Sequence, residues 1–361
     1  MSTNIENHEY DSNSSSFNPM MLPTDHIYLA VLNAAIELNL FEIIGKGSPK
    51  GMSSSEIASK LENPHASMAN RLDRMLFLLS NYSLLICSYN KLDQPDKIER
   101  LYSISPHGKY LIVEKDETSC VRFFKLCNHP TYIKIWQNFK QVILDEEENL
   151  FKKVHGMPMY KYMEMDPTFK TTFHKAMADL SIMQIKDVLE TYEGFEGIST
   201  LVDVAGGVGQ NLKMIISKYP SIQGINFDLP HVVQHGLSHP GMKHLGGDMF
   251  KSVPEGDAMM MKFITHNWGD EKCIQILRNC HRSLKNEGKL IIIDPIMPEI
   301  PNGSDEHKYV SVLDNLMFLQ SGGKERTEKE FEALCKDSGF SSYRIAAHVA
   351  YAALGVIEFY K

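Results

Sequence analysis

The sequence predicts a two-part α/β protein, with a mainly helical amino-terminal region and a carboxyl-terminal region built on a parallel β-sheet. Two observations predict the sheet: short apolar, β-branched runs end near acidic residues, and segments with helical spacing separate them. A third observation, helical spacing followed by a hairpin pattern before residue 116, predicts the separate amino-terminal region. With 361 residues, the chain is long enough for two domains.

Helices are predicted for the first part of residues 21–116, after a mobile, polar leader over residues 1–20. Residues 25–44 have helical apolar spacing, and residues 70–79 place Leu72, Met75, Leu76 and Leu79 on one face. Residues 53–56, Ser-Ser-Ser-Glu, have the pattern of a capping box and predict another helix start. These three segments account for the helical character of the region.

A hairpin completes this region, with strands over residues 84–88 and 101–104 joined by a polar turn through residues 91–99. Three helices and a hairpin form a winged helix, a fold better known for binding DNA. The region carries acids and no basic cluster; examples of the acids are Glu56, Asp73 and Glu99. We therefore expect it to serve protein dimerisation.

The carboxyl-terminal region begins with a strand, residues 200–204, whose apolar, β-branched character is typical of a buried parallel strand. Asp203 lies near its carboxyl end, where open α/β sheets bind ligands. Residues without bulky side chains follow, so that backbone N–H groups can approach a ligand closely. These are Ala205, Gly206, Gly207 and Gly209.

A helix over residues 210–219 and a strand over residues 222–227 complete a nucleotide-type cofactor site, because Asp228 then stands where a ribose diol is bound. An ordinary βαβ unit is the simpler alternative, but strand, glycines, helix and acid all fall in register. A dinucleotide site is disfavoured, since Asn211 and Leu212 occupy the position of the third small residue. The turn resembles the first motif of S-adenosyl-L-methionine-dependent methyltransferases, whose cofactor lacks a pyrophosphate.

The next glycine pair, at the start of residues 246–250, predicts a seat for the adenine. Asp248 is an acceptor for its amino group, and Met249 supplies a polarizable face. We assign Leu229 and Phe250 to the same cofactor-binding set.

His266 is the predicted general base, because it follows the apolar run 258–264, which Lys262 interrupts, and so lies on the sheet rim. A phenol with a pKa near 10 is a poor nucleophile at neutral pH, while an imidazole with a pKa of about 6.5 can accept its proton. A carboxylate orients such an imidazole best, and the two candidates are Asp294 and Glu325. With fifteen histidines in the chain, position and not residue type supports this choice.

The motifs LVDVAGGVG, GINFDLPHV, GGDMF, HNWGDEKC and GGKERTEKEFE together resemble the plant caffeic acid-type small-molecule O-methyltransferases. AVLNAAIELNLFEII, ETYEGFEGISTLVDV and LGVIEFYK are most similar to the legume chalcone (isoliquiritigenin 2′-) O-methyltransferases. The resemblance implies a homodimer with a winged-helix-like dimerisation domain and a Rossmann-like class I methyltransferase domain, working without a metal. It also implies that His266 is the catalytic base and Glu325 one of its two flanking acids, with Asp228, Asp248, Met249 and Lys262 at the cofactor.

Three positions depart from the family pattern. Ala205 replaces the first glycine of the turn, which is tolerated unless the backbone there needs a positive φ. Asn267 replaces an aspartate of the caffeic acid enzymes, but the chalcone enzymes share His-Asn-Trp. Asp294 replaces a glutamate and shortens the reach to His266 by one methylene group, and a misplacement of about 1 Å can cost about a hundredfold in rate.

Residues 117–192 are predicted to form a helical connector that contributes to the substrate pocket, before a catalytic domain over residues 193–361. An apolar stripe in the connector recurs at helical spacing, which is usually a core pattern. The resemblance places it over an aromatic substrate; its members are Phe169, Phe173, Met177 and Leu180. Met317 and Phe318 are expected to close the other side, and Trp268 is substrate wall or core, with core favoured.

Composition limits the partners. A net charge of −8 without a basic cluster disfavours nucleic acid and anionic membranes. No membrane span or signal peptide is predicted, so a cytoplasmic protein is expected, and the six cysteines show neither Cys-x-x-Cys nor metal-ligand spacing.

The predicted function is methylation of a phenolic hydroxyl, with a chalcone as the preferred substrate. An isoflavonoid or a caffeate-type phenylpropanoid is the nearest alternative. A second alternative keeps the fold but has lost methyl transfer or changed it, for example to ligand binding or dehydration, and Ala205 and Asp294 are the features that favour it.

Overall fold

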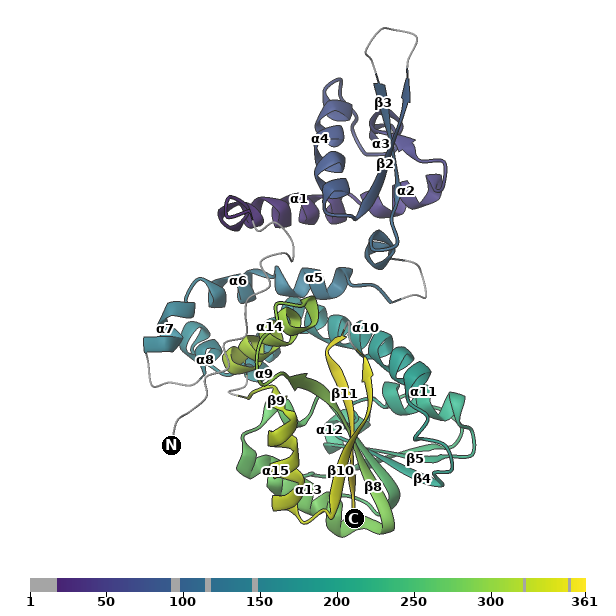
Figure 1. Ribbon diagram of the computed structural model, residues 1–361, viewed down its shortest axis with the longest axis vertical. Coiled ribbons are helices and arrows are strands. Elements are labelled where there is room, and N and C mark those ends of the chain that lie inside the picture. The colour runs from purple at the N-terminus through teal and green to yellow at the C-terminus, as the bar shows by residue number, and fades with distance from the viewer. Residues whose placement is uncertain (1–17, 92–97, 114–117, 145–148, 321–322, 350–351) are drawn as a thin grey trace, which may run out of the picture. The chain divides into compact units, whose positions relative to one another are not determined.

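The computed structural model describes residues 18–91, 98–113, 118–144, 149–320, 323–349 and 352–361 (Figure 1). The chain divides into two compact units, residues 1–121 and 122–361. The predicted leader, the centre of the predicted hairpin turn and Gly322 of the GGKERT motif lie wholly or mostly outside the described residues.

The first unit combines short helices with a three-stranded sheet in the order β1-β3-β2. Its elements are η1 (Leu22–Thr24), α1 (Asp25–Glu37), α2 (Leu40–Gly47), β1 (Met52–Ser53), α3 (Ser54–Ala58), α4 (Met68–Asn81), β2 (Leu85–Lys91), β3 (Ile98–Ile104) and η2 (Gly108–Leu111). The predicted capping box is present at the start of α3, where Ser53 and Glu56 satisfy each other's backbone N–H groups. The predicted hairpin is also present, with Leu85 opposite Ile104.

The single helix predicted over residues 25–44 is wrong, because the structure divides it into α1 and α2. Asn39 lies between them in the left-handed region, with φ of 52°. Asparagine adopts this conformation more readily than most residues, so it ends one helix and redirects the chain into the next. The apolar spacing continues across the break, which hides it from a periodicity analysis.

The second unit is built on an eight-stranded sheet that includes β9 (Arg326–Thr327) as a side pairing on β8. The main order is β10-β11-β8-β7-β4-β5-β6. These strands are β4 (Thr200–Val204), β5 (Gln223–Asp228), β6 (Met242–Gly246), β7 (Gly256–Lys262), β8 (Leu284–Met297), β10 (Ser342–Val349) and β11 (Leu354–Tyr360). Without β11, the strands follow the 3-2-1-4-5-6 order of doubly wound sheets. β11 is inserted between β8 and β10 and runs antiparallel to both.

Strict alternation along the central strands gives the sheet two buried faces. On β7, Met259 and Met261 enter one core while Met260 enters the other, as expected for a strand covered on both sides. The first core is closed by α13 (Asp270–Ser283) and α15 (Glu328–Ser338), and the second by α10 (Pro167–Thr191) and α11 (Gln210–Lys218) (Figure 1).

The connector is helical, as predicted, and forms its own aromatic core with α14 (Asp305–Gln320). Its helices before α10 are α5 (Val121–Cys127), α6 (Pro130–Trp136), α7 (Phe139–Leu144), α8 (Leu150–His155) and α9 (Met159–Met165). The remaining elements are α12 (Pro230–Val233) and η3 (Thr265–Asn267).

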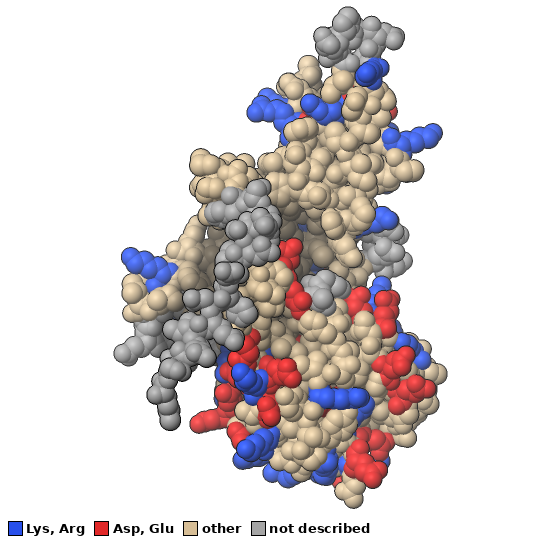
Figure 2. All heavy atoms as spheres, in the orientation of Figure 1, with Lys and Arg blue, Asp and Glu red and all other residues tan. Residues whose placement is uncertain are grey.

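Charged side chains are dispersed over the face shown in Figure 2. Lys and Arg stand in separate groups on the first unit, while Asp and Glu are mixed with Lys and Arg on the second. Among the described helices, none alone is long and apolar enough to cross a membrane, although Leu22–Glu37 and Leu40–Gly47 meet that test if counted together across a bend of 67°.

Candidate active site

The glycine turn after β4 is hydrogen-bonded to the end of the neighbouring strand β5. The backbone N–H groups of Ala205 and Gly206 both donate to the carbonyl of Phe227, at 2.8 and 3.3 Å. A Cβ on Gly206 would lie 2.3 Å from Asn226 Oδ1 and 2.5 Å from Asp203 Oδ2, so only glycine fits there. Gly207 by contrast faces open space. The turn therefore presents bare backbone at the carboxyl end of the sheet, where a ligand can approach it.

Ala205 has φ of 59°, in the left-handed region. The conformation that favours glycine is therefore needed at the one turn position where the chain has alanine. An L-residue pays about 1–2 kcal/mol for this conformation. The substitution thus introduces backbone strain inside the predicted cofactor turn.

Asp203 and Asp228 lie at the carboxyl ends of the neighbouring strands β4 and β5, the positions predicted for them. Asp228 accepts the Gly207 N–H at 2.8 Å and the Leu229 N–H at 2.6 Å, and so fixes the turn. Asp203 is buried, and its Oδ2 has no hydrogen-bond partner among the described residues. Burial, followed by the charge of Asp228, raises the pKa of Asp203 to about 7, against the lowering effect of Lys262. An orphaned buried carboxylate beside a glycine cradle fits a ligand that carries a cationic amine and a sulfonium.

Lys262 is buried at the end of β7 and points toward α10. Its Nζ donates to Gln184 Oε1 at 2.8 Å and to Ser181 Oγ at 3.4 Å. Burial lowers the pKa of Lys262 to about 7, against the raising effect of Asp294 and Asp203. Of these partners, Gln184 and Ser181 were not predicted, because nothing in the local pattern of α10 links it to β7.

The segment predicted to seat an adenine is preorganised by its own side chains. Asp248 Oδ1 accepts the Phe250 N–H at 3.0 Å, and Asn279 donates to the Met249 carbonyl at 2.7 Å. The Phe250 ring meets Trp268 edge-on with centroids 5.0 Å apart. Trp268 and Phe250 both pack against the core that the sheet forms with α13 and α15, which agrees with the preference for a core role at Trp268.

 
His266 lies in η3, directly beyond β7, and one acid fixes its imidazole: Nδ1 is 2.9 Å from Glu325 Oε1. Because a carboxylate only accepts, Nδ1 carries the proton and the lone pair of the neutral ring lies on Nε2. Burial alone lowers the pKa of His266, but the hydrogen bond and charge of Glu325, helped by Asp294, outweigh it and raise the pKa. The ring is thereby oriented and made more basic.

Asp294, the other predicted partner, lies elsewhere in the hydrogen-bond network. Its Oδ2 accepts the hydroxyl of Thr265, the residue before the base, and within the described part of the chain no hydrogen bond links it to His266. Its influence on His266 is a charge effect. The sequence could not show which acid hydrogen-bonds to His266. Asp294 lies on β8 and Glu325 directly precedes β9, which pairs with β8, so only the side-chain geometry distinguishes the two acids.

The apolar residues predicted to contact substrate divide into two groups. Phe169 is fully buried in the connector core, where its ring lies 5.6 Å from Tyr132 and 5.9 Å from Tyr162 between centroids. Phe173 and Met317 are also buried. The remaining members, Met177, Leu180 and Phe318, keep part of their surface accessible. Phe169 is therefore a residue of the connector core, unlike the members that keep accessible surface for a substrate.

Phe263 was missed by the sequence reasoning. Its backbone has φ of 55°, unusual for a bulky residue, and its ring lies parallel to the His266 imidazole, with centroids 5.1 Å apart and an angle of 15°. Lys262 Nζ stands 3.9 Å from the centroid of the same ring. The sequence indicated a role for Phe263 only through its position between Lys262 and His266, both of which are predicted site residues.

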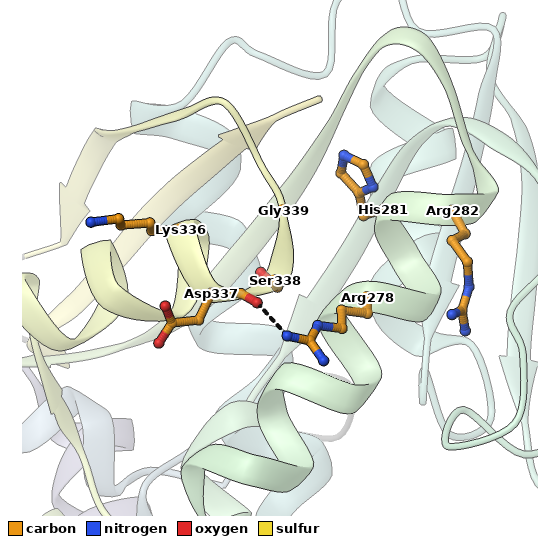
Figure 3. Close-up of a pocket in the computed structure, with 7 residues that line it drawn as sticks. All are labelled: Arg278, His281, Arg282, Lys336, Asp337, Ser338 and Gly339. Atoms are coloured by element: carbon orange, nitrogen blue, oxygen red, sulfur yellow. Dashed lines mark hydrogen bonds between the residues drawn. The ribbon is translucent and has the colours of Figure 1, made fainter.

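A surface hollow lies apart from these residues, between the ends of α13 and α15 (Figure 3). Its lining is Arg278, His281, Arg282, Lys336, Asp337, Ser338 and Gly339. Arg278 Nη2 donates to the Asp337 carbonyl at 2.9 Å. Cations near helix carboxyl ends complement the partial negative charge there, so the hollow has a sufficient structural explanation. Among the described residues, no group of three His, Cys, Asp or Glu side chains is arranged to hold a metal.

Comparison with known proteins identifies the class. Residues 136–341 match the O-methyltransferase domain, and residues 20–114 match the O-methyltransferase dimerisation domain. The human N-acetylserotonin methyltransferase, solved with its cofactor, superposes with a TM-score of 0.76 at 21% identity, covering 96% of this chain and 99% of that one. The calicheamicin-biosynthesis methyltransferase CalO1 gives 0.77 at 21% identity, covering 95% and 99%. The fold is that of class I S-adenosyl-L-methionine-dependent methyltransferases.

Plant enzymes give the nearer likeness. Caffeic acid 3-O-methyltransferase of Rosa chinensis is 44% identical over 332 residues, 91% of this chain and 90% of that protein. Flavonoid 3′-O-methyltransferase of Chrysosplenium americanum is 44% identical over 345 residues, 95% and 98% of the two chains. Esculetin O-methyltransferase of Kitagawia praeruptora is 44% identical over 326 residues, 90% and 89%. The chain belongs to the plant caffeic acid and flavonoid O-methyltransferase family, and it is an S-adenosyl-L-methionine-dependent O-methyltransferase.

Proposed function

We propose that this enzyme methylates a phenolic hydroxyl of a chalcone or related flavonoid, with His266 as general base and without a metal. The observation that supports the base most directly is the buried hydrogen bond from His266 Nδ1 to Glu325 Oε1 at 2.9 Å. It leaves Nε2 as the basic nitrogen, and general-base catalysis by such a group contributes about 10²- to 10⁴-fold.

The bound cofactor supplies an electrophilic methyl group on a sulfonium. We assign its binding to the residues around the glycine turn and the adenine seat, which are Asp203, Ala205, Gly206, Gly207, Asp228, Leu229, Asp248, Met249, Phe250 and Lys262. Asp203 and Asp228 supply negative charge for a cationic ligand. His266 takes the phenolic proton, and Glu325 stabilises the imidazolium that results.

A chalcone is favoured by the sequence motifs shared with the legume chalcone enzymes, including His266-Asn267-Trp268. Asn267 has a structural task as well, since its side chain donates to the Phe263 carbonyl at 2.8 Å. Phenylpropanoids and isoflavonoids remain the alternative substrates, and the caffeate and flavonoid relatives support that breadth. Phe173, Met177, Leu180, Met317 and Phe318 are the proposed substrate contacts.

A member with altered activity is the second candidate, favoured by the strained Ala205 and by the engagement of Asp294 with Thr265. Transfer of a labelled methyl group from S-adenosyl-L-methionine to a panel of chalcones, flavonoids and hydroxycinnamates decides between the two. We expect a product with at least one chalcone. Cofactor binding without any product would support the second candidate.

His266→Ala tests the base. We expect turnover to fall by about 10²- to 10⁴-fold with unchanged affinity for S-adenosyl-L-homocysteine. A normal rate would remove the assignment.

A cytoplasmic homodimer is the proposed assembly. The matched dimerisation domain supports it, as do large apolar side chains exposed on the first unit. Those on η1, α1 and the following turn are Leu22, Ile27, Leu29 and Leu38.

A further inference from the structure

Arg326 is an arginine whose side chain is fully buried, next in sequence to Glu325. Its Nη1 donates to the Thr265 carbonyl at 2.7 Å, and its Nη2 donates to the Trp268 carbonyl at 2.7 Å. These two carbonyls flank His266 on either side. One guanidinium therefore ties together both ends of the turn that carries the proposed base.

The other end of the guanidinium is held by Asp270, at the start of α13. Nε and Nη2 of Arg326 lie 3.1 and 2.7 Å from Asp270 Oδ1. Although burial raises the pKa of Asp270, the hydrogen bond and charge of Arg326, and then the charge of Lys324, lower it overall. A buried guanidinium needs a charged partner and hydrogen-bond acceptors, and here Asp270 and the two backbone carbonyls supply them.

Residues 323–325, which precede Arg326, also contact the turn 265–268. A Cβ on Gly323 would lie 1.9 Å from the His266 carbonyl oxygen, and the Lys324 N–H donates to that oxygen at 3.1 Å. Glu325 follows with its bond to the imidazole. Residues 323–326 thus contact the turn 265–268 through backbone, imidazole and flanking carbonyls in succession.

We propose that Arg326 is a positioning residue for His266, acting through the backbone of the turn, and that it fixes the distance between the imidazole and Glu325. This inference rests on the proposed role of His266 as base. The planar fork of arginine reaches two carbonyls and a carboxylate at once, which the single ammonium of lysine does not. Since a misplacement of about 1 Å can cost about a hundredfold in rate, loss of the fork should appear in turnover.

Arg326→Lys is the primary test, with Arg344→Lys as the matched control. Arg344 Nε also pairs with a buried acid, Glu358 Oε2, at 2.6 Å, but it lies on β10, away from the turn. We expect Arg326→Lys to lower kcat by about tenfold to a hundredfold with KM for S-adenosyl-L-methionine within about twofold. Arg344→Lys should leave kcat unchanged at the same fraction of folded protein. Equal kcat values for the two variants would overturn the proposal.

Hydrogen exchange gives a readout independent of activity. In Arg326→Lys bound to S-adenosyl-L-homocysteine, amides of residues 264–269 should exchange faster, while those of residues 205–209 should not. Unchanged exchange at 264–269 would also overturn the proposal, whatever His266→Ala shows. Guanidinium added to Arg326→Ala should restore part of kcat. If Arg326→Ala does not fold, the kcat of Arg326→Lys decides whether the proposal holds.

Discussion

The ring of Phe263 lies parallel to the imidazole of His266, with centroids 5.1 Å apart. The face of the proposed base is thus supported by an aromatic ring, while its edge is held by Glu325. Phe263 adopts φ of 55° to reach this place, so backbone strain is accepted at the site.

Replacing Phe263 by leucine should lower kcat by about 3- to 10-fold, because ring pairs contribute about 0.5–1.5 kcal/mol beyond their buried area. Phe263→Tyr keeps the ring and serves as the control. Steady-state kinetics on both variants check this; a leucine variant with full turnover would contradict it.

Glu325→Gln should move the acidic limb of the kcat/KM profile to lower pH. The base must be neutral, so the rate falls as pH drops through the pKa of His266. Glu325 raises that pKa, and without its charge, burial lowers it. The plateau should fall by about 10- to 150-fold, since a charged hydrogen bond contributes about 1.5–3 kcal/mol. A limb that stays in place would argue against Glu325 as the partner.

Ala205→Gly should stabilise the protein by about 0.5–1 kcal/mol, because relief of the positive φ exceeds the added flexibility of the unfolded chain. Gly207→Ala is the matched control: φ there is 61°, and a Cβ would meet nothing within 4 Å. That variant should be destabilised. Thermal and urea unfolding measure both, and a destabilised Ala205→Gly would show that the methyl group is needed.

Affinity for S-adenosyl-L-methionine should rise with pH up to about 7. Below that pH, Asp203 is protonated and Lys262 is charged, and both states disfavour a cationic ligand. Asp203→Asn should bind more weakly and with a smaller pH dependence. Calorimetric titration between about pH 6 and pH 8.5 checks this, and the same slope in both proteins would exclude Asp203 as its source.

The local parts of the fold were predictable from sequence. β4 has the predicted bounds, and the capping box at Ser53 is present, because each depends on residues a few positions apart. The break at Asn39 was not predicted, since apolar spacing continues through it. At the site, Glu325 and Asp294 could not be told apart, because the bond to His266 spans 59 residues and depends on how β8 and β9 pair.

That separation has a consequence for partial unfolding. The glycine turn is held by a hydrogen bond to Asp228 of β5, which is only 21 positions away from Gly207 in the sequence. The bond between His266 and Glu325 spans 59 positions, so a much longer loop must close before it can form. Local opening of the segment around β9 would therefore silence the enzyme while leaving the cofactor turn intact. In rising denaturant, turnover is expected to vanish before cofactor affinity does.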